Sequence, residues 1–264
     1  MPVRNPDPRH FSRAVQSVLD QTLEDFEFLI VEDIGERPAA EDLAQFQDPR
    51  IRHLANPGPG SMAEARNRGL SAANTDLVAM FDADDVCHPD RMATQWERLQ
   101  SEPELGVLGS QLTILDEADR RAGQRRYPVE HEAIVATLRF HNALAHPSVM
   151  LRKSLVEAAG GYRNRVCEDY DLWCRLARRG VRFGNHDQTL LSYRVHSGGT
   201  KSRRLRESLR DTIAIKREHW AGDLGPRAQL RILGERILLC LPPPLVLRMF
   251  GWMYLRSSKL GARA

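Results

Sequence analysis

The strongest candidate for chemistry in the sequence is a set of three aspartates, Asp82, Asp84 and Asp85, directly after the apolar run 77–81. Two carboxylates two residues apart at a strand end can converge on Mg²⁺ or Mn²⁺, which prefer oxygen ligands and often bind substrate phosphates as well. Such close acids repel one another unless a cation or hydrogen-bond donors offset their charge. The alternative is a helix N-terminus, but Pro89, which opens the next helix, comes several residues later. The pattern therefore favours a divalent-cation site.

Three further positions could take part in chemistry, and each also has a structural interpretation. Asp169, beside Glu168, could act as a general base or could cap the helix that it opens; taken alone, the residues favour the cap. Arg66 follows a Pro/Gly loop and could pair with phosphate or carboxylate, or lie on a solvated helix face. His196 ends a strand and could bind a metal or a diphosphate, or be structural. The residue types alone leave these alternatives open.

Apolar runs and helical periodicity predict the elements that position these residues. Strands are expected at 26–31, 51–54, 77–81 and 105–115, alternating with helices at 10–21, 39–46, 62–72 and 89–99. This alternation indicates βαβ units and an α/β fold, with a mostly parallel central sheet and helices on both faces. Ligands bind beyond the carboxyl ends of such strands. We therefore expect Glu32 and Asp33, which end one strand, to share a rim with Asp82.

The regular alternation stops after Glu117. Shorter elements follow, with helices expected at 133–140, 155–159 and 169–179, strands at 147–151 and 190–195, and a helical region from 205 onward. We therefore divide the chain into three parts, 1–117, 118–200 and 201–264.

Composition excludes several classes of protein. The chain has 264 residues, of which 42% are hydrophobic and 28% charged, which excludes a mainly disordered chain, a collagen-like chain and a disulfide scaffold. The net charge of +3 is too small to indicate a nucleic-acid partner, although eight basic residues against two acidic ones gather at 194–217. The four cysteines show no CxxC pair or zinc spacing. The N-terminus has no apolar signal-peptide region, so we expect a cytoplasmic protein.

The order of the motifs is more specific than any of them alone. The motifs are MPVRN at 1–5, LIVED at 29–33, FDADD at 81–85, GGYR at 160–163, EDYDLW at 168–173 and YRVH at 193–196. Together they resemble the family 2 inverting glycosyltransferases, which have a GT-A fold. The resemblance runs from Met1 to about His196, roughly three quarters of the chain.

This resemblance implies a nucleotide-sugar-binding half at 1–117 and an acceptor-binding half at 118–200, followed by a basic, amphipathic helical tail. The residues implied in nucleotide-sugar binding are Pro2, Arg4, Glu32, Asp33, Arg66 and Asp82. The implied ligands of the Mn²⁺ or Mg²⁺ ion are Asp84, Asp82 and His196. The implied catalytic pair is Glu168 and Asp169, of which Asp169 is the general base.

The chemistry of glycosyl transfer fits these roles. Breaking a sugar–diphosphate bond develops negative charge on the leaving oxygen, and a divalent cation with Arg66 can stabilise that charge where it forms. The attacking hydroxyl needs a positioned base, and an ionised Asp169 can accept its proton. A single base on the face opposite the leaving group gives inversion by in-line displacement.

The sequence departs from the family pattern in three places. Members of the family begin with an apolar strand before the segment that here starts at Met1, so we expect most of a central first strand to be missing and the true start to lie upstream. Arg4 replaces the tyrosine that stacks on the nucleotide base, although an arginine plane can also stack. The usual Asp-Asp-Gly-Ser sequence reads Glu32, Asp33, Ile34, Gly35, which keeps a carboxylate but alters the turn.

The tail at 232–255 is apolar but carries charges, and three prolines at 242–244 interrupt it. Neither piece reaches the ~20 apolar residues that a spanning helix needs. Two short amphipathic helices suit a membrane surface, and the basic run before them suits anionic headgroups or a lipid-diphosphate acceptor. The alternative is packing against the catalytic domain or a second subunit. A peripheral position at the inner face of the membrane is one of the two outcomes that we expect.

Two other functions are compatible with parts of the sequence. A sugar nucleotidyltransferase uses a related sheet but usually has an N-terminal Gly-rich phosphate loop, which the chain lacks. A catalytically degenerate protein acting as a binding or assembly subunit would explain the short first strand and Arg4. The retained Asp82, Asp84, Asp169 and His196 oppose that interpretation. The main expectation is a glycosyltransferase with a nucleotide-sugar donor and a glycan or lipid-linked acceptor.

Overall fold

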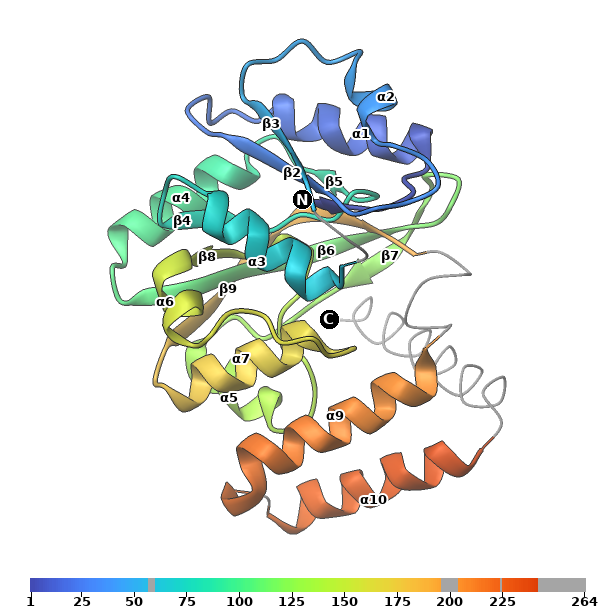
Figure 1. Ribbon diagram of the computed structural model, residues 1–264. Coiled ribbons are helices and arrows are strands. Elements are labelled where there is room, and N and C mark those ends of the chain that lie inside the picture. The colour runs from blue at the N-terminus through green and yellow to red at the C-terminus, as the bar shows by residue number, and fades with distance from the viewer. Residues whose placement is uncertain (57–59, 196–203, 224, 242–264) are drawn as a thin grey trace.

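The computed structural model of the chain describes residues 1–56, 60–195, 204–223 and 225–241 (Figure 1). Its N-terminal part holds a three-stranded parallel sheet in the order β1-β2-β3. The strands are β1 (Pro2–Val3), β2 (Phe28–Glu32) and β3 (Ile51–Ala55). The run FLIVE in β2 is largely buried, as expected of a parallel strand covered on both faces.

A second, mixed sheet of six strands lies beside the first. Its order is β4-β8-β6-β9-β5, with β7 paired to β6. The strands are β4 (Leu77–Ala79), β5 (Val86–Cys87), β6 (Leu105–Leu115), β7 (Arg121–Arg125), β8 (Met150–Arg152) and β9 (Arg182–Arg194). The expected strand 105–115 is confirmed to the residue, and it pairs in parallel with β9. The other pairs of this sheet are antiparallel, so parallel pairing is less extensive here than the alternating pattern predicts.

Helices surround the two sheets (Figure 1). Their bounds are α1 (Pro8–Leu19), α2 (Ala40–Leu43), α3 (Met62–Ala72), α4 (Arg91–Ser101), α5 (His131–Leu138), α6 (Lys153–Ala158), α7 (Glu168–Arg178), α9 (Leu205–Trp220) and α10 (Pro226–Cys240). Short 3-10 turns occupy His146–Ser148 and Ala221–Asp223. Helix α3 begins with a reciprocal capping box between Ser61 and Glu64. This cap fixes the start of the helix after the Pro/Gly loop, and with it the position of Arg66 on the helix.

The first strand is short, as expected. Strand β1 has two residues, and Pro2 and Val3 pair with Val31 and Glu32 of β2. Within the described residues β1 and β4 are both end strands, and no strand pairing joins the two sheets. The N-terminus lies inside the fold between the sheets (Figure 1). The α/β fold class is nevertheless confirmed.

The helical extension begins with α9, which packs on α7 through buried residues that include Ile215 and Trp220. Helix α10 then packs on α9, and the buried Lys216 Nζ lies 2.5 Å from Glu235 Oε1. The part of the expected tail from 242 onward lies outside the described residues. Within the ranges that the structure covers, no helix combines the length and apolar character that a membrane crossing needs.

Candidate active site

The acidic loop after β4 is held in place by Arg194, from the end of β9. The backbone N–H of Arg194 donates to Asp85 Oδ1 at 2.9 Å, and its Nε donates to the Asp84 carbonyl at 2.8 Å. The guanidinium, which is itself buried, also lies 2.5 Å from Asp119 Oδ1. Burial, followed by the charges of Asp84 and Asp82, raises the pKa of Asp85 well above its usual range. Asp85 is therefore a structural anchor, and Asp82 and Asp84 are the acids of the loop that remain for a ligand.

Arg66 connects this loop to the N-terminus of α7. Its guanidinium lies 3.5 Å from Asp82 Oδ1 and forms an ion pair with Glu168 Oε1. Burial acts to lower the pKa of Arg66, but the charges of Asp82 and Glu168 raise it above its ordinary value, so Arg66 stays charged. The pKa of Asp82 is raised, first by burial and then by Asp84, while Arg66 opposes the shift.

The first turn of α7 supplies two carboxylates. Burial raises the pKa of Glu168 to about 6, although Arg66 acts in the opposite direction. Asp169 Oδ2 accepts a hydrogen bond of 2.7 Å from Asn142 Nδ2, and its Oδ1 accepts one of 2.7 Å from the Tyr170 backbone. The helix dipole also favours negative charge at this end. Asp169 is thus a carboxylate fixed in orientation, as a general base must be.

Tyr162 shows that these groups converge. Burial raises the pKa of its hydroxyl, the positive charge of Arg66 opposes that shift, and the negative charges of Asp169, Glu168 and Asp82 add to it. The Arg66 guanidinium lies 5.7 Å from the centre of the Tyr162 ring. Residues from the loop after β4, from α3 and from α7 are far apart in the sequence, and their charges therefore act on one another here.

The GGYR loop is clamped to α3 by Asn67. Its Nδ2 donates to the Tyr162 carbonyl at 2.8 Å, and its Oδ1 accepts from the Tyr162 backbone N–H at 2.7 Å. Gly161 has φ +70°, and a Cβ there would lie 2.8 Å from Asn67 Oδ1. A glycine is needed at this position for both backbone and space.

The end of β2 forms a second part of the rim. Asp33 is buried, and its Oδ1 accepts from Asn56 Nδ2 at 3.2 Å and from the Gly60 N–H at 3.1 Å. Arg4, which is more than half exposed, lies 3.9 Å from Asp33 Oδ2. Pro2, also in the predicted site, pairs in β1 with Val31 and holds this segment beside β2.

Glu32 lies away from this part of the rim. Its Oε1 accepts from the Ala39 N–H at 2.5 Å, and its Oε2 lies 2.6 Å from His53 Nε2. Of these two acids, both predicted to take part in nucleotide-sugar binding, Asp33 is therefore the one that faces Arg4. His196, the remaining predicted ligand, lies outside the described residues.

Another acidic group, Asp171 with Glu218 and His219, has its ligand atoms within 4.8 Å of one another. The fully buried Asp171 is already surrounded by positive charge, since Arg175 lies at 2.8 Å, Arg165 at 3.5 Å and Arg163 at 3.7 Å. Three guanidiniums repel a cation, so this group is an ion-pair network that joins α7 to α9. The acidic rim is the better candidate for a metal ion.

Sequence reasoning missed the residues that position the site. Asn142, Tyr162 and the structural role of Asp85 were not predicted, and neither was the contact of Arg194 with the acidic loop. The only available signals were their places in the motifs FDADD, GGYR and YRVH. Asn142 belongs to none of these motifs.

Comparison with known proteins agrees with this geometry. The profile of Glycosyl transferase family 2 matches residues 1–159. The chain is 29% identical over 198 residues to the O-antigen biosynthesis glycosyltransferase WbnJ of Escherichia coli, covering 73% of this chain and 77% of WbnJ. It is 28% identical over 219 residues to the amylovoran biosynthesis glycosyltransferase AmsE of Erwinia amylovora, covering 80% of each.

Solved structures show the same fold. The mannosyltransferase PcManGT of Pyrobaculum calidifontis, in complex with GDP-Man and Mn²⁺, superposes with a TM-score of 0.63 at 16% identity, covering 94% of this chain and 70% of that one. Residues 1–349 of S. aureus TarS in complex with UDP give a TM-score of 0.62 at 15% identity, covering 88% and 68%. The profile match extends over more than half of the chain. The chain is therefore a glycosyltransferase that belongs to Glycosyl transferase family 2.

Proposed function

We propose that this glycosyltransferase is inverting and metal-assisted, and that it moves a sugar from a nucleotide-sugar donor to a hydroxyl of a glycan or lipid-linked glycan. The observation that carries the proposal is the convergence of Asp82, Arg66 and the carboxylates of α7 on one rim. The O-antigen and amylovoran functions of WbnJ and AmsE support an acceptor of the cell-surface polysaccharide type.

The residues of the acidic loop fit a divalent cation. Asp82 and Asp84 offer oxygen donors. Burial and then the charge of Asp84 raise the pKa of Asp82, and Arg66 only partly offsets this shift. Mn²⁺ or Mg²⁺ would neutralise the donor diphosphate when bound. The Mn²⁺ in the GDP-Man complex of PcManGT supports this assignment. The sequence also proposes His196 as a ligand.

Asp169 is the proposed base. Its two hydrogen bonds, from Asn142 and from the Tyr170 backbone, fix the direction of the carboxylate. The carboxylate would accept the proton of the acceptor hydroxyl while that oxygen attacks the anomeric carbon. Arg66 would stabilise the negative charge of the leaving diphosphate, with Glu168 orienting the guanidinium.

The nucleotide base is proposed to lie against Asp33 and Arg4. Asp33 is positioned by Asn56 and Gly60, and the exposed Arg4 plane is free to stack on a base ring. UDP in TarS and GDP-Man in PcManGT are the nucleotides to test first.

Turnover of nucleotide sugars tests the proposal. Release of UDP or GDP from a panel of nucleotide sugars should depend on Mn²⁺ or Mg²⁺, and Asp169→Asn and Asp84→Asn should each reduce kcat by roughly 10²–10⁴-fold. Asp187→Asn, at a carboxylate that is 79% exposed, is the matched control and should not change kcat. Nucleotide binding without turnover of any donor would instead favour the binding or assembly subunit.

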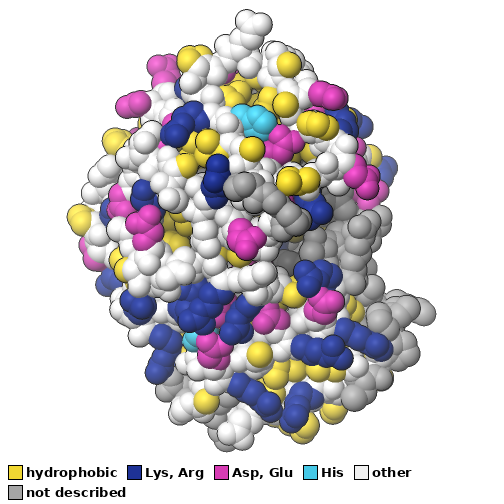
Figure 2. Space-filling model, viewed as in Figure 1, with side chains coloured by type: hydrophobic (Ala, Val, Ile, Leu, Met, Phe, Trp, Pro, Cys, Tyr) yellow, Lys and Arg dark blue, Asp and Glu magenta, His cyan; other side chains and the backbone are white. Residues whose placement is uncertain are grey.

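A peripheral membrane position is also part of the proposal. Leu230, Leu233 and Ile237 form an exposed stripe on α10, with exposed fractions of 70%, 53% and 57%. The exposed Arg231 and Arg236 lie on the same helix. Figure 2 shows basic side chains gathered over the part of this face where α9 and α10 lie, with hydrophobic side chains among them. Apolar residues beside arginines suit an anionic membrane surface and support the proposed position at the inner face of the membrane.

Sedimentation with vesicles tests this position. The chain should sediment with vesicles that contain phosphatidylglycerol and much less with phosphatidylcholine alone. Replacing Leu230, Leu233 and Ile237 with Ser should abolish sedimentation, whereas Met62→Ser, at a residue of α3 that is 49% exposed, should not. Equal sedimentation of both variants would contradict the membrane assignment.

A further inference from the structure

Helix α9 of the C-terminal extension packs along α7, whose first turn carries Glu168 and Asp169 (Figure 1). Near the middle of α7, the indole Nε1 of Trp220 donates to Cys174 Sγ at 3.3 Å. At the start of α7, Asp211 of α9 lies against the backbone that precedes Glu168. The extension therefore reaches the end of α7 at which the proposed base lies.

Asp211 makes the hydrogen bond that a capping box would supply within α7. In a capping box, the side chain at the third helical position accepts from the N–H of the N-cap residue. That position in α7 is Tyr170, whose hydroxyl donates to the Leu138 carbonyl instead. The N-cap residue is Cys167, and its N–H donates to Asp211 Oδ2 at 2.9 Å. A carboxylate 44 residues later in the chain therefore takes the place of a local cap.

Both helices hold Cys167. Its carbonyl accepts from the Asp171 N–H at 3.0 Å, as the first hydrogen bond within α7. Its Sγ lies 3.6 Å from two oxygen atoms of α9, the Ser208 carbonyl and Thr212 Oγ1. Its own side chain therefore makes no cap for α7. The residue directly before the proposed catalytic pair depends on α9 for the position of its N–H and of its side chain.

The Asp211 carboxylate is itself held between α9 and the loop before α7. Its Oδ1 lies 3.5 Å from Arg165 Nη1, and its side chain is 16% exposed. Burial raises the pKa of the Cys167 thiol to about 12, and the charges of Asp169 and Asp211 both add to this rise. The Asp211 carboxylate and the proposed base therefore lie on either side of one buried thiol.

We propose that Asp211 is a positioning residue for glycosyl transfer, which holds the first turn of α7 and so places Asp169 against the acceptor hydroxyl. This inference rests on the proposed role of Asp169 as the base. Asn142 holds the Asp169 side chain at Oδ2, and Asp211 holds the backbone that carries that side chain. A shift of about 1 Å in a catalytic group can cost roughly 10²-fold in rate. Helix α9 is then part of the catalytic unit.

Substitutions at Asp211 in the full chain test the proposal. Asp211→Ala should speed hydrogen exchange at the Cys167 amide by at least ~10-fold, which is measurable without any donor. It should also lower kcat, measured as release of UDP or GDP, by roughly 10-fold. KM for the nucleotide sugar should change by less than about 2-fold, because Asp33 and Arg4 lie on other elements. Asp211→Asn keeps an oxygen that can accept from the Cys167 N–H, so it should restore most of the protection and of kcat.

Glu218→Ala is the matched control on the same helix. Glu218 contacts Arg163 at 2.8 Å and forms an ion pair with Arg165, so its loss weakens the packing of α9 without removing the partner of the Cys167 N–H. It should lower Tm by an amount similar to that of Asp211→Ala. Exchange at Cys167 and kcat should stay close to those of the unsubstituted chain. If Asp211→Ala does not fold, Asp211→Leu and Asp211→Asn give the same comparison, because they are similar in size and differ in the acceptor.

Three outcomes would overturn the proposal. The first is unchanged exchange at Cys167 in Asp211→Ala, and the second is an equal loss of kcat in Asp211→Ala and Glu218→Ala. The third is fast exchange at Cys167 with unchanged kcat, which would show that the cap does not position the base. Full activity of Asp169→Asn would instead contradict the proposed function itself, whatever the exchange rate at Cys167.

Discussion

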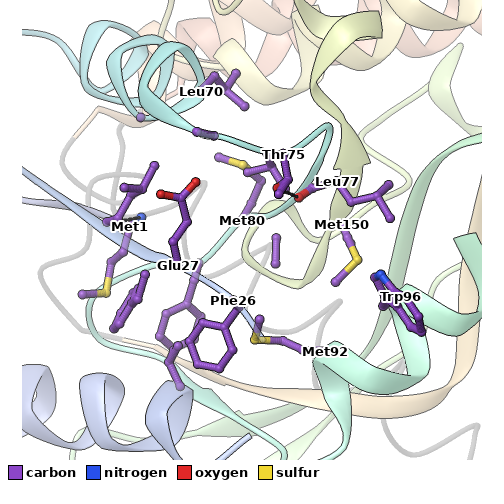
Figure 3. Close-up of a pocket in the computed structure, with 18 of the residues that line it drawn as sticks. Met1, Phe26, Glu27, Leu70, Thr75, Leu77, Met80, Met92, Trp96 and Met150 are labelled. Carbon is purple, nitrogen blue, oxygen red and sulfur yellow. Dashed lines mark hydrogen bonds between the residues drawn. The ribbon is translucent and has the colours of Figure 1, made fainter. Parts of the chain in front are cut away.

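The acidic rim and an apolar cavity of about 420 Å³ lie along the same two strands, β2 and β4, but they are lined by different groups. At the rim, buried charges lie against opposite charges from distant segments, as Arg66 does with Asp82 and Glu168. The cavity is lined mostly by apolar side chains (Figure 3), and the Met1 amine at its wall donates to the Leu29 carbonyl at 2.8 Å. Ion pairs therefore dominate at the rim, and apolar side chains dominate around the cavity.

This difference predicts different sensitivities. Charge changes at the rim should act through the pKa values and through lost ion pairs, because its backbone is already fixed. The cavity should respond to the charge of the Met1 amine, because that amine is buried in its wall.

Removal of the Arg194 guanidinium should have the largest effect on stability. Arg194→Met removes a fully buried guanidinium, so that Asp119 loses its 2.5 Å partner and the Asp84 carbonyl loses a donor. We expect the free energy of unfolding to fall by about 3–5 kcal/mol, measured by urea denaturation.

Asp85→Asn is the matched variant for this test. The amide keeps an oxygen that can accept from the Arg194 N–H, and it removes a negative charge that burial already disfavours at this site, so it should cost far less. Equal losses for the two variants would contradict the view that the fold depends on the charge of Arg194 but not on a charge at Asp85.

Acetylation of the Met1 amine should be the next largest effect. The pKa of the amine falls from 8.0 to about 5 on folding, so between these values the unfolded chain binds a proton that the folded chain does not. Stability should therefore rise with pH from 5 to 8, by up to about 4 kcal/mol. The acetylated chain keeps the N–H donor to Leu29 and should lose this pH dependence. Thermal unfolding of the free and acetylated chains at pH 5.5 and pH 8.5 measures this pH dependence. Identical pH dependence of the two chains would count against a buried terminus.

The parts of the fold that were predictable from sequence are those with local signals. Strand β6 could be predicted because 105–115 is a continuous apolar, β-rich run. Strands β5 and β7 were missed because Val86–Cys87 is only two residues long and Arg121–Arg125 is mostly polar. Both exist because they pair with longer neighbours, which periodicity cannot show.

The candidate site divides in the same way. Asp82 and Asp84 follow an apolar run, so their position at a strand end was predictable. The direction of Glu32 was not, since it is set by Ala39 and His53 on other elements. The pairing of Arg194 with Asp85, 109 residues apart, depends on the register between β5 and β9. Local spacing identifies candidate residues, but only tertiary contacts decide which of them face one another.

Glu168→Gln should change stability by a smaller amount. The pKa of Glu168 is raised from 4.5 to about 6, so in this window the folded chain holds a proton that the unfolded chain releases. The stability that this proton provides is present below pH 4.5 and is lost as the pH rises through 6, a fall of up to about 2 kcal/mol. The amide removes this fall, which denaturant titrations at pH 4.5 and pH 7 can measure. A steeper fall in the variant would contradict the raised pKa.

The smallest expected effect is the difference between alanine substitutions at two adjacent glycines beside the rim. Both have positive φ, +85° at Gly160 and +70° at Gly161, so alanine at either costs about 1–2 kcal/mol of backbone strain. At Gly160 nothing lies within 4 Å of an added Cβ, whereas at Gly161 Asn67 Oδ1 lies 2.8 Å away and must move. Gly161→Ala should therefore cost about 1 kcal/mol more than Gly160→Ala. Asn67 clamps Tyr162 beside Arg66, so Gly161→Ala should also lower kcat, whereas Gly160→Ala should leave kcat unchanged. Equal kcat values for both variants would show that the clamp stabilises the loop without positioning the rim.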